Sequence, residues 1–180
     1  MKNILLDASS AILLFKAELF HKLVTVYTIS CTRSVLQELI RGDRCGADTF
    51  LRCSTGSVLS VIDISNEGFS RENASPALRN LDRGELDTVL CFTAGGWDFI
   101  ITDDGRAAKY CRQNNIPFIN AILFPRLLYF CHAISLPESI RKMEELISLG
   151  RYSREVIEWA MNCGRESLHF AIPDICGIDK

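Results

Sequence analysis

Short apolar runs alternate with stretches of helical periodicity through most of the chain. Runs rich in branched and aromatic residues predict five strands, at residues 3–7, 24–29, 58–64, 99–101 and 117–119. Apolar residues spaced three or four apart predict helices between them, at residues 10–21, 34–41, 43–54, 76–81, 84–94, 105–114 and 121–133. Strands that alternate with helices join in parallel. The pattern therefore predicts a three-layer α/β/α sandwich with a parallel five-stranded sheet.

Two amphipathic helices follow this alternating region, at residues 137–149 and 153–163, and Gly150 separates them. We expect residues 1–133 to form one domain, and residues 134–180 to form a helical hairpin and tail packed on it. Apolar stripes on the two helices favour packing on the domain. These stripes comprise Ile140, Met143, Leu146 and Ile147 on the first helix, and Val156, Ile157 and Ala160 on the second.

Residues 84–104 place acidic residues at both ends of an apolar segment. Glu85 and Asp87 stand where a helix begins, and Asp103 and Asp104 stand directly after a short buried strand. Gly95 and Gly96 break the helix between them. The chain thus carries carboxylates at a helix start and at a strand end within one stretch.

Two further acids occupy positions that a plain apolar core does not require. Asp7 ends the first strand, and Glu38 lies within an otherwise apolar helix. In an open α/β sheet, ligands bind outside the carboxyl ends of the strands where the strand order reverses. The first and fourth strands are expected to flank that point. Asp7 should therefore lie beside Asp103 or Asp104.

Clustered carboxylates need a proton or a cation to relieve their repulsion. Two carboxylates about 4 Å apart repel by roughly 4 kcal/mol at an effective dielectric constant of about 20. An all-oxygen site suits a hard cation, Mg²⁺ or Mn²⁺, which supports hydrolysis of a phosphodiester. His21, His132 and His169 are not placed to act as a base. A water activated at the metal is therefore the expected nucleophile.

Each acid also has a purely structural explanation. Asp7 could cap the following helix, and Glu38 could lie on a solvated face. Glu85 and Asp87 could complement a helix dipole, and the Asp103-Asp104 pair before a glycine could form an ordinary turn. These alternatives do not explain why the four positions coincide.

Composition limits the function classes. The net charge of −2 argues against a surface coated in basic charge for non-specific nucleic-acid binding, but an acidic metal site is compatible with it. No apolar run approaches the ~18 residues needed to cross a bilayer. The eight cysteines form no CxxC pair, so we expect reduced thiols in a cytoplasmic protein.

The ordered motifs LLDASSAI, VLQEL, GELDTV and IITDDGRAAKYCRQNNIP resemble the PIN-domain family. The likeness covers roughly residues 3–125 and is strongest to a branch with a GE-x-[DE] helix start. It implies an α/β/α fold and a Mg²⁺- or Mn²⁺-dependent endoribonuclease that acts on single-stranded RNA. Members of the family are often the toxin of a toxin–antitoxin pair, with a small antitoxin protein as partner. The resemblance also suggests that the C-terminal helices contribute in part to a homodimer interface, and the alternative is that they pack only on their own domain.

The resemblance also assigns roles to residues of this chain. Asp7, Glu38, Asp87 and a fourth acid match the catalytic and metal-binding acids, and Glu85 accompanies them. The fourth acid is Asp103 by the branch motif and Asp104 by the T-x-D form. Ser9 matches a hydroxyl residue that holds a metal water or a phosphate. Asn120 stands where relatives often have Gly-Thr, so the resemblance does not predict the conformation of the turn at this position.

Three basic residues beyond the fourth acid, Arg106, Lys109 and Arg112, could bind phosphates from one side of a helix, or could simply be solvated. The main alternative to a ribonuclease is a catalytically silent PIN-like domain that binds or regulates a partner. A phosphatase-like or receiver-like domain ranks lower, because Lys109 does not directly follow a strand.

Overall fold

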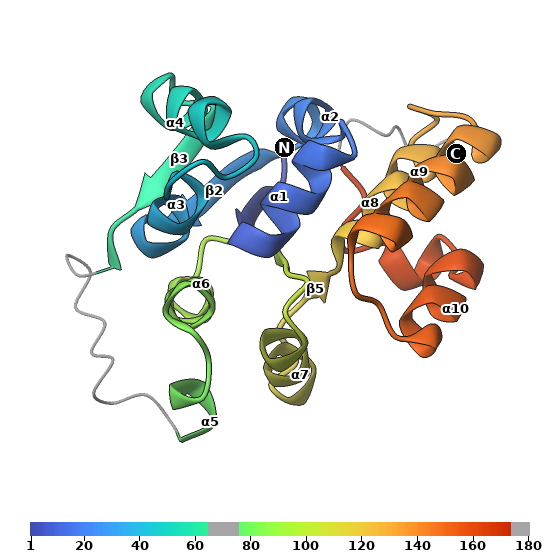
Figure 1. Cartoon of the computed structure of the whole chain (residues 1–180). Helices are drawn as coiled ribbons and strands as arrows, with labels where there is room; N and C mark the ends of the chain where they lie inside the picture. The colour runs from blue at the N-terminus through green and yellow to red at the C-terminus, as the bar shows by residue number, and fades with distance from the viewer. Residues whose placement is uncertain (65–75, 174–180) are drawn as a thin grey trace.

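Five parallel strands form one sheet in the computed structural model, which describes residues 1–64 and 76–173 (Figure 1). The order is β3-β2-β1-β4-β5, so the chain builds outward from β1 to one side and then to the other. Ile4 pairs with Ile29 of β2 and with Phe99 of β4, which makes β1 the central strand. The strands are β1 Asn3–Leu6, β2 Thr28–Thr32, β3 Leu59–Ile62, β4 Phe99–Ile101 and β5 Phe118–Ile119.

Alternate residues of the central strands enter two separate cores, one on each face of the sheet. On β1, Ile4 and Leu6 join the larger core, while Leu5 joins the smaller one with Ile100 of β4. Helices cover both faces, which confirms the predicted α/β/α sandwich. The larger core takes residues from α1 Ala8–Lys16, α2 Phe20–Val26, α3 Arg33–Leu39, α4 Ala47–Thr55, η3 Ala121–Leu123, α8 Phe124–Phe130, α9 Leu136–Leu149, α10 Arg154–Asn162 and η4 Glu166–Leu168. The smaller core takes residues from α5 Pro76–Arg79, α6 Arg83–Thr93 and α7 Gly105–Gln113.

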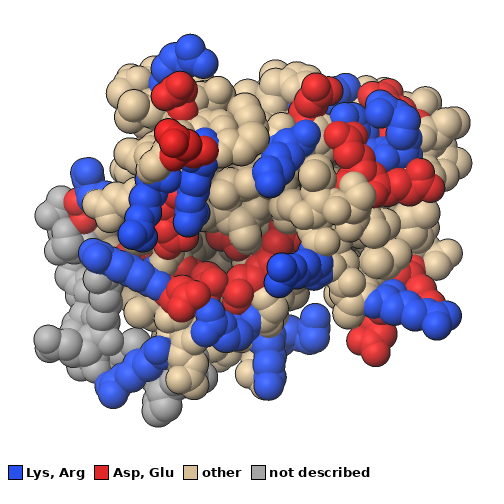
Figure 2. All heavy atoms as spheres, in the orientation of Figure 1, with Lys and Arg blue, Asp and Glu red and all other residues tan. Residues whose placement is uncertain are grey.

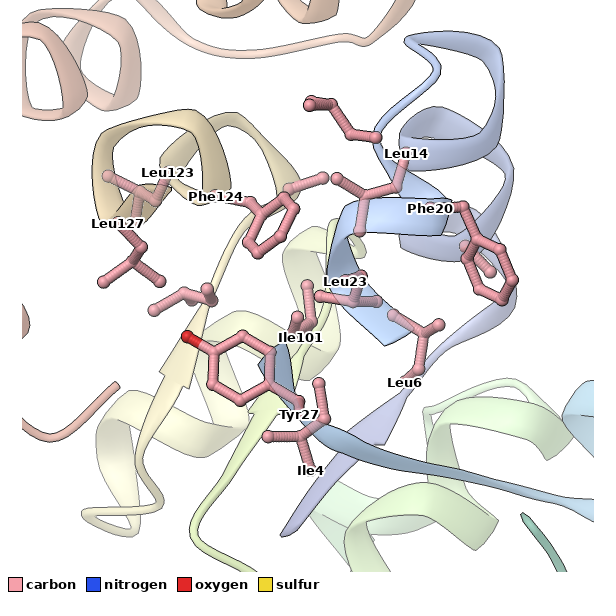
Figure 3. Close-up of a cluster of buried hydrophobic side chains, with 14 of the residues drawn as sticks. Ile4, Leu6, Leu14, Phe20, Leu23, Tyr27, Ile101, Leu123, Phe124 and Leu127 are labelled. Carbon is pink, nitrogen blue, oxygen red and sulfur yellow. The ribbon is translucent and has the colours of Figure 1, made fainter. Parts of the chain in front are cut away.

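Tyr27 lies at the centre of the larger core (Figure 3). Its ring packs against Phe99 of β4 and Phe124 of α8, with centroid separations of 5.4 and 6.3 Å. Its hydroxyl donates a 2.5 Å hydrogen bond to the carbonyl of Ala171, near the end of the described chain. One aromatic side chain thereby joins the sheet to the C-terminal helices.

The C-terminal helices pack on the rest of the same chain. Helix α9 contacts α1, η3 and α8, and its residues Met143 and Leu146 are fully buried, as is Ala160 of α10. Lys142 donates a 2.6 Å hydrogen bond to the carbonyl of Ala17, the residue that follows α1. The apolar stripes thus contribute to the core of their own chain, and the homodimer stays a prediction.

The second strand begins later than expected. The predicted strand at residues 24–29 is wrong in its first part, because α2 continues to Val26 and β2 begins at Thr28. Leu23 and Val26 enter the core from a helix, and the apolar pattern did not distinguish a short helix from a strand. The predicted helix at residues 10–21 is also interrupted, because Glu18 adopts a positive φ of 57° between α1 and α2. The expected loop at residues 65–75 lies outside the described residues.

Six described cysteines are free thiols, as expected: Cys31, Cys45, Cys53, Cys91, Cys111 and Cys163. Cys131 is disulfide-bonded, so the expectation of reduced thiols is wrong for this residue. Over the described ranges, none of the helices has both the length and the apolarity that crossing a membrane requires.

Candidate functional site

The strand order reverses between β1 and β4, and the two expected acids meet there. Asp7 directly follows β1, and its amide donates a 3.1 Å hydrogen bond to the carbonyl of Ile101, the last residue of β4. Asp103 lies two residues beyond Ile101, and its amide donates to Asp7 Oδ2 at 3.3 Å. We refer to Asp7 and Asp103 as the acid pair.

The Asp7 carboxylate is held by hydrogen bonds from its own chain. Oδ1 accepts the amide of Ser10 at 2.6 Å and the hydroxyl of Ser9 at 3.0 Å. Oδ2 accepts the hydroxyl of Thr102 at 2.5 Å in addition to the amide of Asp103. Asp7 therefore caps α1, as one structural alternative predicted, and at the same time anchors the segment after β4.

Ser10 connects the two acids. Its amide binds Asp7, and its buried hydroxyl donates to Asp103 Oδ2 at 2.7 Å. The amide of Ala121, at the start of η3, donates to the same Oδ2 atom at 3.0 Å. Three segments, after β1, β4 and β5, thus converge on Asp103.

The second oxygen of Asp103, Oδ1, is buried and accepts no hydrogen bond. The Tyr152 hydroxyl, from the segment between α9 and α10, is also buried and unpaired. The two groups lie near enough for the hydroxyl to lower the pKa of Asp103, although they form no hydrogen bond of normal geometry. A buried carboxylate oxygen without a donor is the least satisfied acceptor of this site.

Burial raises the pKa of both members of the acid pair. For Asp103, burial and the neighbouring Asp7 raise the pKa to about 6. For Asp7, burial raises the pKa, and hydrogen bonds from Thr102, Ser10 and Ser9 oppose that rise. Neighbouring carboxyl groups with raised pKa values are frequent at functional sites.

Glu38 reaches the same region from α3. An ideal Cβ added to Gly84 of α6 would lie 2.5 Å from Glu38 Oε1, so the carboxylate rests directly on the glycine. Burial raises the pKa of Glu38, Arg44 lowers it, and the charge of Asp7 raises it. Glu38 therefore lies within electrostatic reach of the acid pair.

We expect Gly84→Ala to displace the Glu38 carboxylate and weaken Mn²⁺ binding about tenfold. The fold should be retained, because alanine favours a helix over glycine by up to ~1 kcal/mol and can offset part of the contact. Calorimetric Mn²⁺ titration and a thermal melt would measure both effects. Gly105→Ala is the matched control, because its added Cβ meets open space at the start of α7. Unchanged Mn²⁺ affinity in Gly84→Ala would contradict a role for Glu38.

Asp87 lies on the buried face of α6, one turn after Gly84, with 2% of its surface exposed. Helix α6 contacts α3, which carries Glu38, and β1, which Asp7 directly follows; it also contacts β2. Asp87 is thus on the face of α6 that is turned toward the sheet, as its predicted role requires.

Glu85 and Asp104 act as helix caps. Glu85 accepts the amide of Asp82 at 2.9 Å in a capping box at the start of α6, and burial raises its pKa to about 7. Asp104 accepts the amides of Arg106 and Ala107, both at 2.8 Å, at the start of α7. Both acids therefore have the local structural role that the alternatives predicted. Within the part of the chain that the structure describes, neither is hydrogen-bonded to the acid pair.

Acidic side chains gather in a central hollow of one face, with Lys and Arg side chains around them (Figure 2). Arg106 is one of the basic residues near these acids, but it is bound to Asp82 at 2.7 Å and lies 3.9 Å from Glu85. Lys109 and Arg112 are exposed on α7 and form no ion pair with any described residue. These two are the freer cations for binding a phosphate.

The donor set fits a hard cation in kind, because it consists of carboxylate and hydroxyl oxygens. However, too few of these side chains lie together. Within residues 1–64 and 76–173, no three His, Cys, Asp or Glu side chains are grouped closely enough to hold an ion. Asp103 Oδ1 is the one carboxylate oxygen of the acid pair that accepts no hydrogen bond of normal geometry, and the Tyr152 hydroxyl is its neighbouring donor. The described residues therefore match a hard cation in the chemistry of their oxygen atoms, but they are not grouped closely enough to hold one.

No protein-family model, no curated protein and no solved structure matches this chain. The likeness to PIN domains rests on the motifs of the sequence.

Sequence reasoning missed three parts of the site. The motifs single out Ser9 and not Ser10, and Ala121 contributes a backbone amide that leaves no signature in the sequence. Tyr152 had no signal, because it lies far from Asp103 along the chain and reaches it only through the packing of α9. Only a tertiary structure places such groups.

Proposed function

We propose that this protein is a PIN-like, divalent-metal-dependent endoribonuclease that hydrolyses single-stranded RNA. The observation that carries the proposal is the acid pair. It joins the ends of β1 and β4 at the reversal of strand order, with raised pKa values and with Asp103 Oδ1 unpaired. A site built this way favours a bound cation, because the cation relieves the repulsion between the two carboxylates.

The residues of the chain would have two roles, which are to hold the cation and to orient the phosphate. Asp7 and Asp103 would hold Mg²⁺ or Mn²⁺ from the strand ends, with Glu38 and Asp87 supporting it from two helices. When bound, the cation would polarise a phosphoryl oxygen and lower the pKa of a water. Ser9, whose side chain is exposed beside Asp7, and Lys109 would orient the phosphate.

Unpaired RNA is the substrate class that the surface favours. The acids lie in a hollow ringed by basic side chains (Figure 2), and a flexible single strand can follow such a surface into the hollow. By its resemblance, the protein would be the toxin of a toxin–antitoxin pair, acting in the cytoplasm as a homodimer with a small antitoxin protein as partner. A small gene beside its own would support that part of the proposal.

Incubation of the purified protein with unstructured and hairpin RNA, in Mg²⁺, Mn²⁺ or EDTA, tests the proposal. We expect cleavage of the unstructured RNA only when a divalent cation is present. Glu144→Gln, on an exposed position of α9, is the control and should cleave like the parent. Folded protein that cleaves no RNA in either metal would rule out the ribonuclease.

A second candidate is a catalytically silent domain that binds a partner. One observation favours it: the Asp7 carboxylate already accepts four hydrogen bonds, so a cation must displace at least one donor. Mn²⁺ titration separates the two candidates. A silent domain that keeps Asp7 capped would show no saturable Mn²⁺ binding, whereas the nuclease should bind the ion and lose that binding in Asp7→Asn.

A further inference from the structure

A groove of about 470 Å³ is lined by residues of α7, β5 and α10. Its walls include three aromatic side chains, Phe118, Trp159 and Phe170. Trp159 is 48% exposed, so its ring is accessible from the solvent. The volume falls within the ~300–1,000 Å³ typical of small-ligand sites. We refer to it as the α10 groove.

The α10 groove is connected to the acid pair through the segment after β5. Asn120 lines the groove, and its side-chain amide donates a 2.6 Å hydrogen bond to the carbonyl of Thr102. The amide of the next residue, Ala121, donates to Asp103 Oδ2. The wall of the groove is therefore bonded directly to the segment that carries Asp103. A strand that presents a phosphate to the acid pair can place a neighbouring base in the groove.

Two charged side chains in the groove remain available for a ligand. Arg112 of α7 and Glu155 of α10 both line it, and neither forms an ion pair within the described ranges. Glu155 lies in the first turn of α10 and Arg112 in the last turn of α7, where each also complements a helix dipole. Dipole effects alone do not explain why both charges share a groove with three aromatic rings.

We propose that the α10 groove binds one unpaired base, guanine in preference, of the RNA that reaches the acid pair. Aromatic side chains stack with any base, and an arginine binds the adjoining phosphate. A carboxylate offers two acceptor oxygens, which match the adjacent N1–H and N2–H donors of guanine. Uracil presents one such donor between two acceptors, so Glu155 discriminates against it. This assignment rests on the proposed function, since it places the base of the substrate.

Fluorescence of Trp159 reports the stacking without any cleavage. The chain contains two tryptophans, so Trp97→Phe leaves Trp159 as the only one. In EDTA, we expect GMP to quench its fluorescence saturably and UMP to bind at least fivefold more weakly. A short uridine oligonucleotide with one central guanosine should bind more tightly than GMP. If Trp97→Phe does not fold, the difference between the parent and Trp159→Phe gives the same signal.

Substitutions in the groove give the decisive comparison. Trp159→Ala should weaken oligonucleotide binding about tenfold, measured by anisotropy of a labelled RNA. Glu155→Gln should remove most of the preference for guanosine, while Glu158→Gln, on the same helix but outside the groove, should keep it. Absence of saturable quenching, equal binding of guanosine and uridine, or binding of GMP but not of the oligonucleotide would each overturn the proposal. Quenching without cleavage would support it and refute only the nuclease.

Discussion

Asp103→Asn should abolish metal-dependent RNA cleavage, whereas Asp104→Asn should leave cleavage nearly unchanged. In Asp103→Asn, the remaining side-chain oxygen can still accept the bonds from Ser10 and Ala121, so the fold is kept while the charge next to Asp7 is lost. Because loss of a group that only supports a metal ligand costs ~10–100-fold, we expect the loss of a ligand to cost at least about 100-fold. Initial cleavage rates in Mn²⁺ measure the effect.

The Asp104 variant is a close control, since it neutralises the adjacent carboxylate. Asparagine caps helices as well as aspartate, so α7 should keep its start and the variant its melting temperature. If Asp104→Asn were inactive and Asp103→Asn active, the T-x-D form of the motif would be the correct alignment. The acid pair would then have a purely structural role.

Without a divalent cation, the protein should lose stability as the pH rises from about 4 to about 7. Burial and Asp7 raise the pKa of Asp103 from 3.8 to about 6 in the folded state, so the folded protein binds a proton that the unfolded chain has released. The stabilisation is present in full below about pH 4 and is lost as the pH rises through about 6. A difference of about two pKa units corresponds to about 3 kcal/mol in the free energy of unfolding.

Chemical denaturation in EDTA, at several pH values between 4.5 and 7.5, would measure this dependence. Mn²⁺ should restore stability at pH 7.5, because a cation bound to the acid pair replaces the lost proton. Asp103→Asn should make the profile shallower, since its amide does not titrate, while Glu85, whose pKa is raised to about 7, still contributes a dependence on pH. If the free energy of unfolding of the parent protein stays constant across this range, the pKa of Asp103 is not raised in the folded state.

The sequence alone was sufficient for the layers of the fold and for the meeting of Asp7 with Asp103. Residues 99–101 and 117–119 read as buried strands because each is a short apolar run bounded by polar or breaking residues, and a parallel sheet buries such runs on both faces. The order of strands and helices then predicted where the sheet reverses. Asp7 and Asp103 lie side by side because the carboxyl ends of parallel neighbours share one edge.

Only the tertiary structure decided how each acid is used. Residue type does not distinguish Asp103 from Asp104, but Asp103 accepts hydrogen bonds from Ser10 and Ala121, whereas Asp104 caps α7. The pattern of apolar residues did not predict the start of β2 either, because Val26 can fill the core from a helix or from a strand. Tyr152 reaches Asp103 through the packing of α9 against the first helix. Local spacing determines which residues share a face, whereas contacts between distant segments depend on how those faces finally pack.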